Sequence, residues 1–167
     1  NRSVGIRGQT TTLVKDLIFK SKVDNHEQVK KILLQQINLI PKNSIMSEND
    51  NISHTDWNLP KAMERKYSSL FVEVVSPHLE MIRKKLNVFK VQIDNFWFQI
   101  YGENGKQEWH THPHTHFSNV YYLECPKGAG TEFQNLDVQC EEGDILSFPA
   151  FLPHRSPPLL SNSTKTI

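Results

Sequence analysis

The sequence predicts an α+β protein in which two helices are followed by many short strands that form a sandwich or barrel. Apolar residues recur at helical spacing in the first half of the chain. From Val88 onward, apolar and polar residues alternate, and turn residues separate the short apolar runs. With 167 residues the chain has the length of one domain, in which 1–87 supply an N-terminal strand and supporting helices and 88–167 form the β core.

The first predicted elements are a strand and a helix. Residues 1–12 are polar and are expected to be flexible or to lie at a sheet edge, and Leu13–Val23 is predicted to be a strand. Asp24 and Glu27 form a D-x-x-E pattern similar to a capping box, which predicts a helix that begins at Asp24. Pro41 is expected to end this helix. Its apolar face consists of Val29, Ile32, Leu33, Ile37 and Ile40.

A polar loop is predicted for Lys42–Asn58, and a second helix is predicted to begin near Pro60. Pro77 is expected to kink or break this helix, because proline lacks the backbone donor. Both helices are interpreted as a scaffold that packs on the outside of a sheet. The buried stripe of the second helix consists of Met63, Tyr67, Leu70, Phe71, Val74, Val75, Leu79, Ile82 and Leu86.

The second half contains the predicted strands. The run Phe96–Tyr101 (FWFQIY) has aromatic residues on both faces, which is typical of a strand that is buried on both sides. Turns are predicted at Glu103–Gly105 and Glu142–Asp144. Other predicted strands are the alternating stretch around Phe89, Val91 and Ile93, then Asn119–Glu124, Thr131–Gln134, Asp137–Cys140, Ile145–Phe148 and Lys165–Ile167.

The composition excludes several classes of protein. The formal net charge is +1, so no global basic field favours nucleic acid. The sequence contains no apolar run of 18 residues, so no transmembrane helix is predicted, and no signal peptide is visible. Cys125 and Cys140 do not make a disulfide framework, so a reduced protein is expected. Without a P-loop, a G-x-G-x-x-G or a G-x-S-x-G motif, neither a nucleotide-binding enzyme nor a serine hydrolase is supported.

A histidine cluster is the strongest functional signal. Five of the eight histidines lie in Tyr101–His116 (YGENGKQEWHTHPHTH) and at His154. Side chains two apart in a strand share a face, so His110 and His112 are expected to project together and to bind one metal ion. Glu108 shares that face if the strand is regular. Neutral imidazoles suit Fe, Zn, Cu and Ni, and no cysteine lies nearby to indicate a structural zinc site.

Five motifs follow one another in the second half: Tyr101-Gly102, Gln107–His112, Val120–Leu123, Gly143–Pro149 and Leu152–His154. This ordered set resembles the Fe(II)/2-oxoglutarate-dependent oxygenases, and within them the small prolyl-hydroxylase-like group of marine bacteria and their phages. The resemblance covers about residues 96–167 and extends loosely to Thr55-Asp56-Trp57. It implies a double-stranded β-helix (jelly-roll) barrel with the two N-terminal helices packed on one sheet. It also implies a hydroxylase that decarboxylates 2-oxoglutarate oxidatively.

The resemblance implies the metal ligands. Members of the family hold Fe(II) with an H-x-D or H-x-E pair and a distal histidine. Carried over to this sequence, His110 is the first ligand and His154 is the distal ligand. His112 stands where the family has its carboxylate, so an iron site with three histidines is expected.

The resemblance also implies a site for 2-oxoglutarate. The family places an Arg or Lys on the strand after the distal histidine, and Lys165 lies eleven positions after His154. Tyr122, the second Tyr of VYYL, matches a position that assists this cation. Gln99 and Tyr101 match an Asn-x-Tyr pair that faces the cosubstrate in the related nucleic-acid demethylases. The alternative role of the tyrosines is core packing with a satisfied hydroxyl.

Other ligand sets remain open. Glu108 would supply a carboxylate in a reversed register, and His114 or His116 would join if the strand bends at Pro113. The cupins share the barrel and resemble parts of the same motifs, and such a protein would not need 2-oxoglutarate. The ligands of a cupin would be His110, His112, His116 and His154.

The expected partners are 2-oxoglutarate, O2 and a peptide or small-molecule substrate, and the resemblance suggests a prolyl residue. Trp57, Trp97 and Trp109 are candidates for a substrate groove, and Arg155 for its rim. Neither a membrane nor nucleic acid is expected as a partner, whereas a homo-oligomer is compatible with the sequence. The expected location is the cytoplasm, or the host cytoplasm if the protein is phage-encoded.

Overall fold

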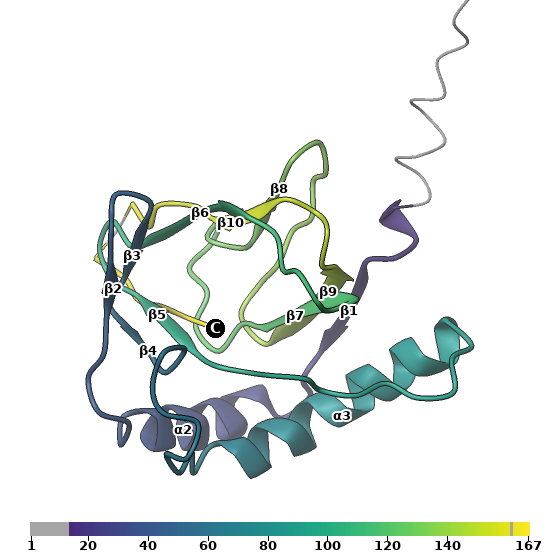
Figure 1. The fold of residues 1–167 in the computed structure, drawn as a ribbon, viewed down its shortest axis with the longest axis horizontal. Coiled ribbons are helices and arrows are strands. Elements are labelled where there is room, and N and C mark those ends of the chain that lie inside the picture. Colours follow the sequence, from purple (N-terminus) through teal and green to yellow (C-terminus); the bar gives the residue numbers. More distant parts are fainter. Residues whose placement is uncertain (1–13, 161) are drawn as a thin grey trace, which may run out of the picture.

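The computed structural model describes residues 14–160 and 162–167 (Figure 1). The predictions for residues 1–12 and for Leu13 lie outside the described residues. The described part of the chain contains two helices of twelve or more residues and three antiparallel sheets. None of the described helices combines the length and the apolar character that crossing a membrane requires.

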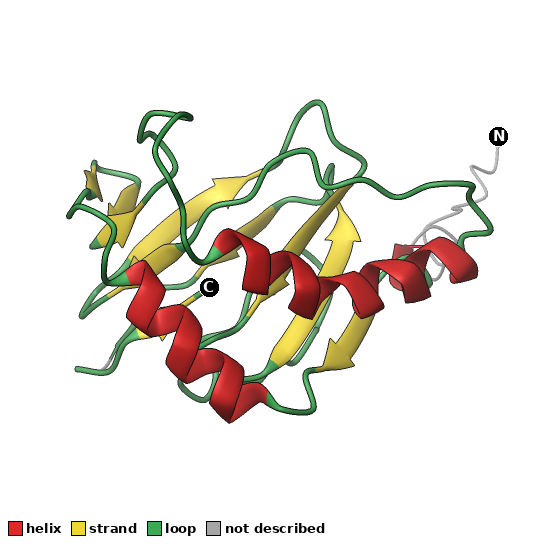
Figure 2. Ribbon diagram, turned by 90° about the horizontal axis from the view of Figure 1, so that it is seen from below, coloured by secondary structure: helices red, strands yellow, loops and turns green. Residues whose placement is uncertain are grey.

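The two helices, α2 (His26–Ile37) and α3 (Ser68–Lys85), lie on one side of the strands, as both views show (Figures 1 and 2). Their apolar faces pack against residues from the strands, which buries the largest apolar cluster of the molecule. This confirms the predicted α+β class and the role of the helices as a scaffold. The buried members of this cluster are Val29, Leu33, Ile37, Ile40, Tyr67, Val75, Phe98, Tyr121, Leu123 and Ile145.

The strands pair in three sheets. One sheet has the order β1 (Phe19–Lys22), β9 (Asp144–Pro149), β7 (Phe117–Tyr121). The second has the order β2 (Ile45–Met46), β3 (Asp50–Ile52), β6 (Lys106–His110), β10 (His154–Ser156), β8 (Glu132–Phe133). The third has the order β11 (Lys165–Thr166), β5 (Gln99–Tyr101), β4 (His54–Thr55). The neighbours β6 and β10 therefore bring together segments that are far apart in the sequence.

The start of the chain differs from the prediction in two ways. The predicted strand at Leu13–Val23 is shortened to β1, because Val14 and Lys15 lie in a helical turn. The predicted capping box does not form, and α2 begins at His26 without a side-chain cap. Val23 donates its backbone N–H to the Gly143 carbonyl at 3.0 Å, so the chain is still bound to the sheet edge just before Asp24.

The second helix also differs from the prediction. It begins at Ser68 rather than near Pro60, and it continues through Pro77. Buried residues on both sides of the proline, Val75 and His78, hold the helix against the sheet. Tertiary packing therefore outweighs the missing backbone hydrogen bond.

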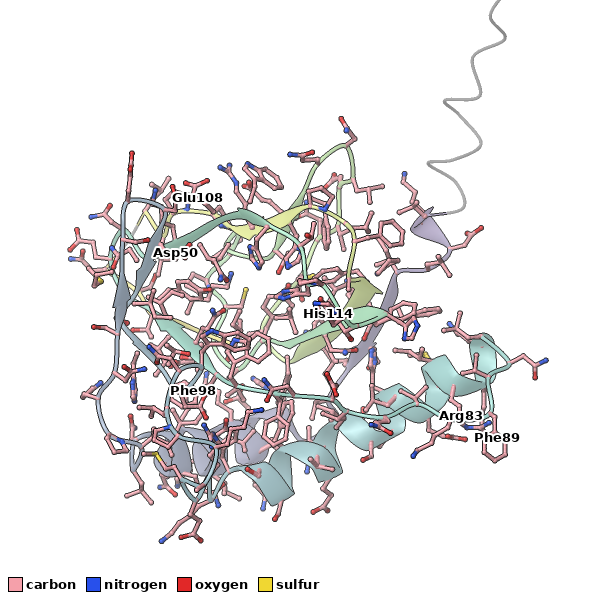
Figure 3. The ribbon with its side chains drawn as sticks, viewed as in Figure 1. Asp50, Arg83, Phe89, Phe98, Glu108 and His114 are labelled. Atoms are coloured by element: carbon pink, nitrogen blue, oxygen red, sulfur yellow. The ribbon has the colours of Figure 1, made fainter. Side chains whose placement is uncertain are left out.

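Several strand predictions were also wrong. The predicted loop Lys42–Asn58 contains β2, β3 and β4, whose two or three residues are too few to show an alternating pattern. The alternating stretch around Phe89 forms no strand, and Phe89 itself is 98% exposed and points away from the molecule (Figure 3). Asp137–Cys140 forms no strand either.

The strand that was predicted at Phe96–Tyr101 is shortened to β5 (Gln99–Tyr101), and its two-sided burial is confirmed there and at Phe98. Phe98 and Ile100 pack in the cluster with the helices, and Figure 3 shows Phe98 on the helix side of the strands. Gln99 and Tyr101 alternate with them and are also buried. This second face carries the polar residues of the candidate site.

Candidate metal centre and its surroundings

Three histidines from separate segments converge. His110 ends β6, His112 lies in the loop that follows, and His154 begins β10. Their ligand nitrogens all lie within 4.8 Å of one another. His110 and His154 are direct cross-strand partners, and His112 is fixed because its backbone N–H donates to the Ala150 carbonyl at 3.0 Å. The sheet and one loop contact therefore position all three rings.

Backbone carbonyls orient two of the rings. Nδ1 of His110 lies 2.7 Å from the Glu108 carbonyl, and Nδ1 of His154 lies 2.8 Å from the Leu152 carbonyl. Because a carbonyl only accepts, each Nδ1 carries the proton and each Nε2 offers its lone pair. A hydrogen bond of this kind is what usually orients a metal-binding histidine.

The spacing of the ring nitrogens fits metal coordination. Nε2 of His112 lies 3.2 Å from Nε2 of His154. Two nitrogens that each lie about 2.0–2.1 Å from one metal ion are roughly 2.8–3.0 Å apart in octahedral geometry and roughly 3.3–3.4 Å apart in tetrahedral geometry. The two imidazoles are therefore already separated as neighbouring ligands of one ion would be.

Burial keeps these imidazoles neutral. It lowers the pKa of His154 to about 4, and it also lowers the pKa of His112, with a smaller contribution from His110. The ring of Phe148 packs against His154 with ring centroids 4.6 Å apart. At neutral pH the nitrogens can bind a metal without first losing a proton.

The strand that carries His110 is irregular. His154 pairs with His110, but Ser156 pairs with Gln107, so two residues of β6 oppose the single residue Arg155 of β10. This is a β-bulge. His110 and Gln107 are three positions apart on β6. Because of the bulge, their partners on β10, His154 and Ser156, are only two positions apart.

The bulge separates Glu108 from the metal group, the three histidines His110, His112 and His154 that could bind one ion. The Glu108 carboxylate pairs with Lys106 at 3.1 Å, and its backbone N–H donates to Asp50 at 3.2 Å. Figure 3 shows Glu108 and Asp50 close together beside β3. Trp109 is packed under Arg155, whose guanidinium carbon lies 4.9 Å from the ring centroid. The regular strand that would have placed Glu108 beside His110 is therefore not formed.

The other histidines of the tract lie outside the group. His114 and His116 are exposed, and His114 has a positive φ of 68° in the turn between β6 and β7. Within residues 14–160 and 162–167, the group at His110 includes no fourth histidine, cysteine or carboxylate.

A second group of possible ligands lies near the start of α2. It consists of His26, Glu27 and Glu142, whose ligand atoms also lie within 4.8 Å of one another. The Lys30 ammonium lies 2.5 Å from the Glu142 carboxylate and neutralises it. Nδ1 of His26 is hydrogen-bonded to the Tyr121 hydroxyl at 2.9 Å. This group is explained as a partly exposed ion pair that joins α2 to the turn before β9.

A buried cation, Lys165 on β11, is bonded to β10, the strand that carries His154. Lys165 is 1% exposed, and its ammonium donates to the Ser156 hydroxyl at 2.9 Å. Ser156 follows His154 by two residues on β10, so the two side chains share a face. In the described part of the chain, Lys165 forms no ion pair with a carboxylate. Burial lowers its pKa to about 8.

Polar and aromatic side chains surround Lys165. Its ammonium lies 5.4 Å from the ring centroid of Tyr101 and 5.9 Å from that of Tyr122. The Tyr101 hydroxyl donates to Gln99 at 2.8 Å. The Tyr122 hydroxyl instead donates to Thr131 at 2.7 Å, as in the packing alternative. The structure thus brings Lys165, Tyr101 and Gln99 together, and a role for Tyr122 toward a ligand stays a prediction.

The sequence did not single out two residues that contact Lys165 and Tyr101. Ser156 could have been found, because it follows His154 by two positions on a strand. Gln107, whose side-chain oxygen lies 3.4 Å from the Tyr101 hydroxyl, gave no signal, because the bulge places it three positions before His110.

Neither a protein-family model nor a curated protein matches the sequence. Two solved structures have a similar fold, each with a TM-score of 0.60 and 14% identity. One is the viral collagen prolyl hydroxylase of Paramecium bursaria Chlorella virus 1 in complex with 2OG, with 90% of this chain and 92% of that chain covered. The other is a prolyl-4-hydroxylase of Pseudomonas putida, with 93% of this chain and 94% of that chain covered. At this identity the likeness shows a common fold.

Proposed function

We propose that the protein is a non-haem Fe(II)- and 2-oxoglutarate-dependent dioxygenase that hydroxylates a prolyl residue of a peptide. The observation that carries the proposal is Lys165, a buried cation without a carboxylate partner among the described residues, which is bonded to Ser156 two positions after His154 on β10. A buried charge of this kind is costly unless an anion binds to it. The two similar structures support the proposal, since both are prolyl hydroxylases and one holds 2OG.

The donor set fits Fe(II). Neutral imidazoles bind Fe(II), and three of them on one side of the ion leave positions open for other ligands. No ligand of this set carries a negative charge, so the dianionic 2-oxoglutarate would supply the charge that the family obtains from a carboxylate. We also infer that the three sheets together form the double-stranded β-helix, with the polar face of β5, β6 and β10 inside it.

The chemistry follows from this arrangement. Bound Fe(II) and 2-oxoglutarate would supply the oxidation, in which O2 is consumed, 2-oxoglutarate becomes succinate and CO2, and one oxygen atom enters a substrate C–H bond. His110, His112 and His154 would hold the metal. Lys165 and Ser156 would bind the distal carboxylate of 2-oxoglutarate, with Lys165 acting as a point charge. Phe148, packed against His154, helps to exclude water.

A cupin-type protein that does not use 2-oxoglutarate is the second candidate, because the same three histidines would serve it. Its fourth ligand would be His116, which is exposed and lies outside the group. It would also have no use for a buried lysine beside the metal. Both observations favour the oxygenase.

The test is an anaerobic titration of the Fe(II)-loaded protein with 2-oxoglutarate, monitored by the visible charge-transfer absorption of the chelate. We expect a saturable band from the wild-type protein. H110A and H154A should bind no stoichiometric iron, whereas H114A, which removes an exposed histidine of the same tract, should bind as the wild type does. Bound iron without a band would support the cupin alternative, and stoichiometric iron in H110A or H154A would refute the site.

A further inference from the structure

A pair of tryptophans lies beside the metal group. The rings of Trp57 and Trp97 are in contact, with centroids 4.2 Å apart. The ring of Trp97 lies 6.0 Å from the ring of His112. Trp97 lies two residues before β5, the strand that carries Gln99 and Tyr101. The pair therefore extends the wall of the candidate site outward from His112.

Buried hydrogen bonds fix the backbone beneath this pair. The Asp56 carboxylate, 1% exposed, accepts from the backbone N–H of Phe98 at 3.0 Å and from the Tyr67 hydroxyl at 2.6 Å. The Thr55 hydroxyl donates to the Phe98 carbonyl at 2.6 Å. The backbone N–H of Trp57 donates to the Thr55 hydroxyl at 3.2 Å. These bonds join the residues next to each tryptophan, so both indoles are held on a rigid base.

The outer ring is nevertheless open to solvent, because Trp57 is 51% exposed. A rigid aromatic side chain that is exposed beside a reaction centre gives up little conformational freedom on binding a ligand. Packing alone does not explain why the chain would fix this ring at the surface with buried polar groups.

We propose that Trp57 and Trp97 form a platform that binds an uncharged, proline-rich segment of a peptide substrate next to the metal. This inference rests on the proposed function and names the part of the substrate that the site recognises. Proline-rich segments are already extended, and they dock on surfaces lined by aromatic rings. The platform would hold such a segment so that one of its residues reaches the open side of the metal.

The charges around the platform favour a peptide over single-stranded nucleic acid. Bases also stack on tryptophan, but the phosphates need unpaired cations close by. Arg65, which is bonded to the Asp56 carboxylate at 2.6 Å, is neutralised by it. The formal net charge of the whole chain is only +1.

The three tryptophans give a direct assay. We would label the indole nitrogens with 15N, load the protein with Zn(II) and 2-oxoglutarate to prevent turnover, and titrate it with an oligoproline peptide. The Trp57 and Trp97 signals should shift while the Trp109 signal stays, because Trp109 is packed under Arg155. W57A should weaken binding about three- to tenfold. W109A, which removes another partly exposed tryptophan, is the matched control and should bind as the wild type does.

The outcomes separate the platform from the proposed function. The platform would be overturned if the Trp57 and Trp97 signals did not move, or if W57A and W109A weakened peptide binding equally. It would also be overturned if a glycine-serine peptide of the same length caused equal shifts, or if oligo(dT) caused shifts in place of the peptide. Binding of Zn(II) and 2-oxoglutarate is measured on the same samples. If the wild type binds neither, the proposed function fails, and the peptide-induced shifts alone then decide the platform.

Discussion

Replacing Lys165 with methionine should separate the stability of the protein from its function. The substitution keeps a long side chain in the buried space but removes the charge. If Lys165 exists to bind the carboxylate of 2-oxoglutarate, K165M will lose that ligand and yet unfold less readily than the wild type. If Lys165 only supports the fold, K165M will be less stable.

The expected size follows from the pKa of the ammonium. Burial lowers this pKa from 10.5 to about 8, which corresponds to a cost on the order of 3 kcal/mol for keeping the charge at pH 7. Methionine removes this cost but leaves the Ser156 hydroxyl without its partner, a loss of about 1–2 kcal/mol. We therefore expect K165M to raise the free energy of unfolding by about 1–2 kcal/mol at pH 7.

The pH dependence gives a second check. The unfolded chain keeps the lysine proton up to about pH 10.5, whereas the folded protein releases it near pH 8. The unfolded state thus binds more protons in this interval, so wild-type stability rises with pH there relative to K165M. The advantage of K165M should shrink between pH 8 and 10.5. The affinity of the wild type for 2-oxoglutarate should fall over the same interval, because the ligand needs the charged ammonium.

Urea unfolding at pH 7 in the presence of Zn(II), with and without 2-oxoglutarate, measures both effects. The ligand should stabilise the wild type by about 2.7 kcal/mol at a concentration of 100 Kd, and it should not stabilise K165M. K106M is the matched control, since Lys106 pairs with Glu108 away from the metal group, and it should change stability by less than about 1 kcal/mol. A destabilised K165M, or one that still binds 2-oxoglutarate, would refute the reasoning.

Two further predictions concern histidines. H112D should raise the affinity for Fe(II) by on the order of tenfold, because an anionic ligand replaces a neutral one. Competition with a chelator measures this, and weaker binding would mean that His112 is not a ligand. The pKa of His78, which is buried between Ser21 and Ser147, is lowered from 6.5 to about 4. The unfolded chain therefore takes up a proton before the folded protein does as the pH falls. The free energy of unfolding of the wild type should fall by about 1.4 kcal/mol per pH unit between pH 6.5 and 4 relative to that of H78Q. Equal slopes in urea unfolding would contradict this.

Residue spacing predicted the parts of the site that depend on regular local geometry. Two histidines two positions apart, with one more after a later turn, indicated the group that His110, His112 and His154 form. The alternation in Phe96–Tyr101 indicated a segment with one face toward the helices and one toward the site. The alternation at Gln99–Tyr101 follows the period of the strand and can be read without knowing the partner strands. His112 lies in the loop after β6, so its place in the group depends on the contact with Ala150 and not on strand alternation.

The rest depended on contacts between distant residues. The strands at His54–Thr55 and Asp50–Ile52 are two and three residues long, and it is their pairing with β5 and β6 that makes them strands. Pro77 lies inside a helix because the residues around it are buried against the sheet. Local propensity contains none of this information, so it predicted a loop in the first case and a break in the second.

The bulge in β6 shows how one irregularity can decide the chemistry of a site. In a regular strand Glu108 would stand beside His110 and supply a carboxylate to the metal. With the bulge, the Glu108 side chain pairs with Lys106, while its carbonyl orients the His110 ring. In the proposed site the metal would then have neutral nitrogen ligands only. Under the proposed function, the ligand bound by Lys165 would balance the positive charge of the ion. K165M removes a positive charge from the site and H112D adds a negative one, and we expect metal and cosubstrate binding to report both changes.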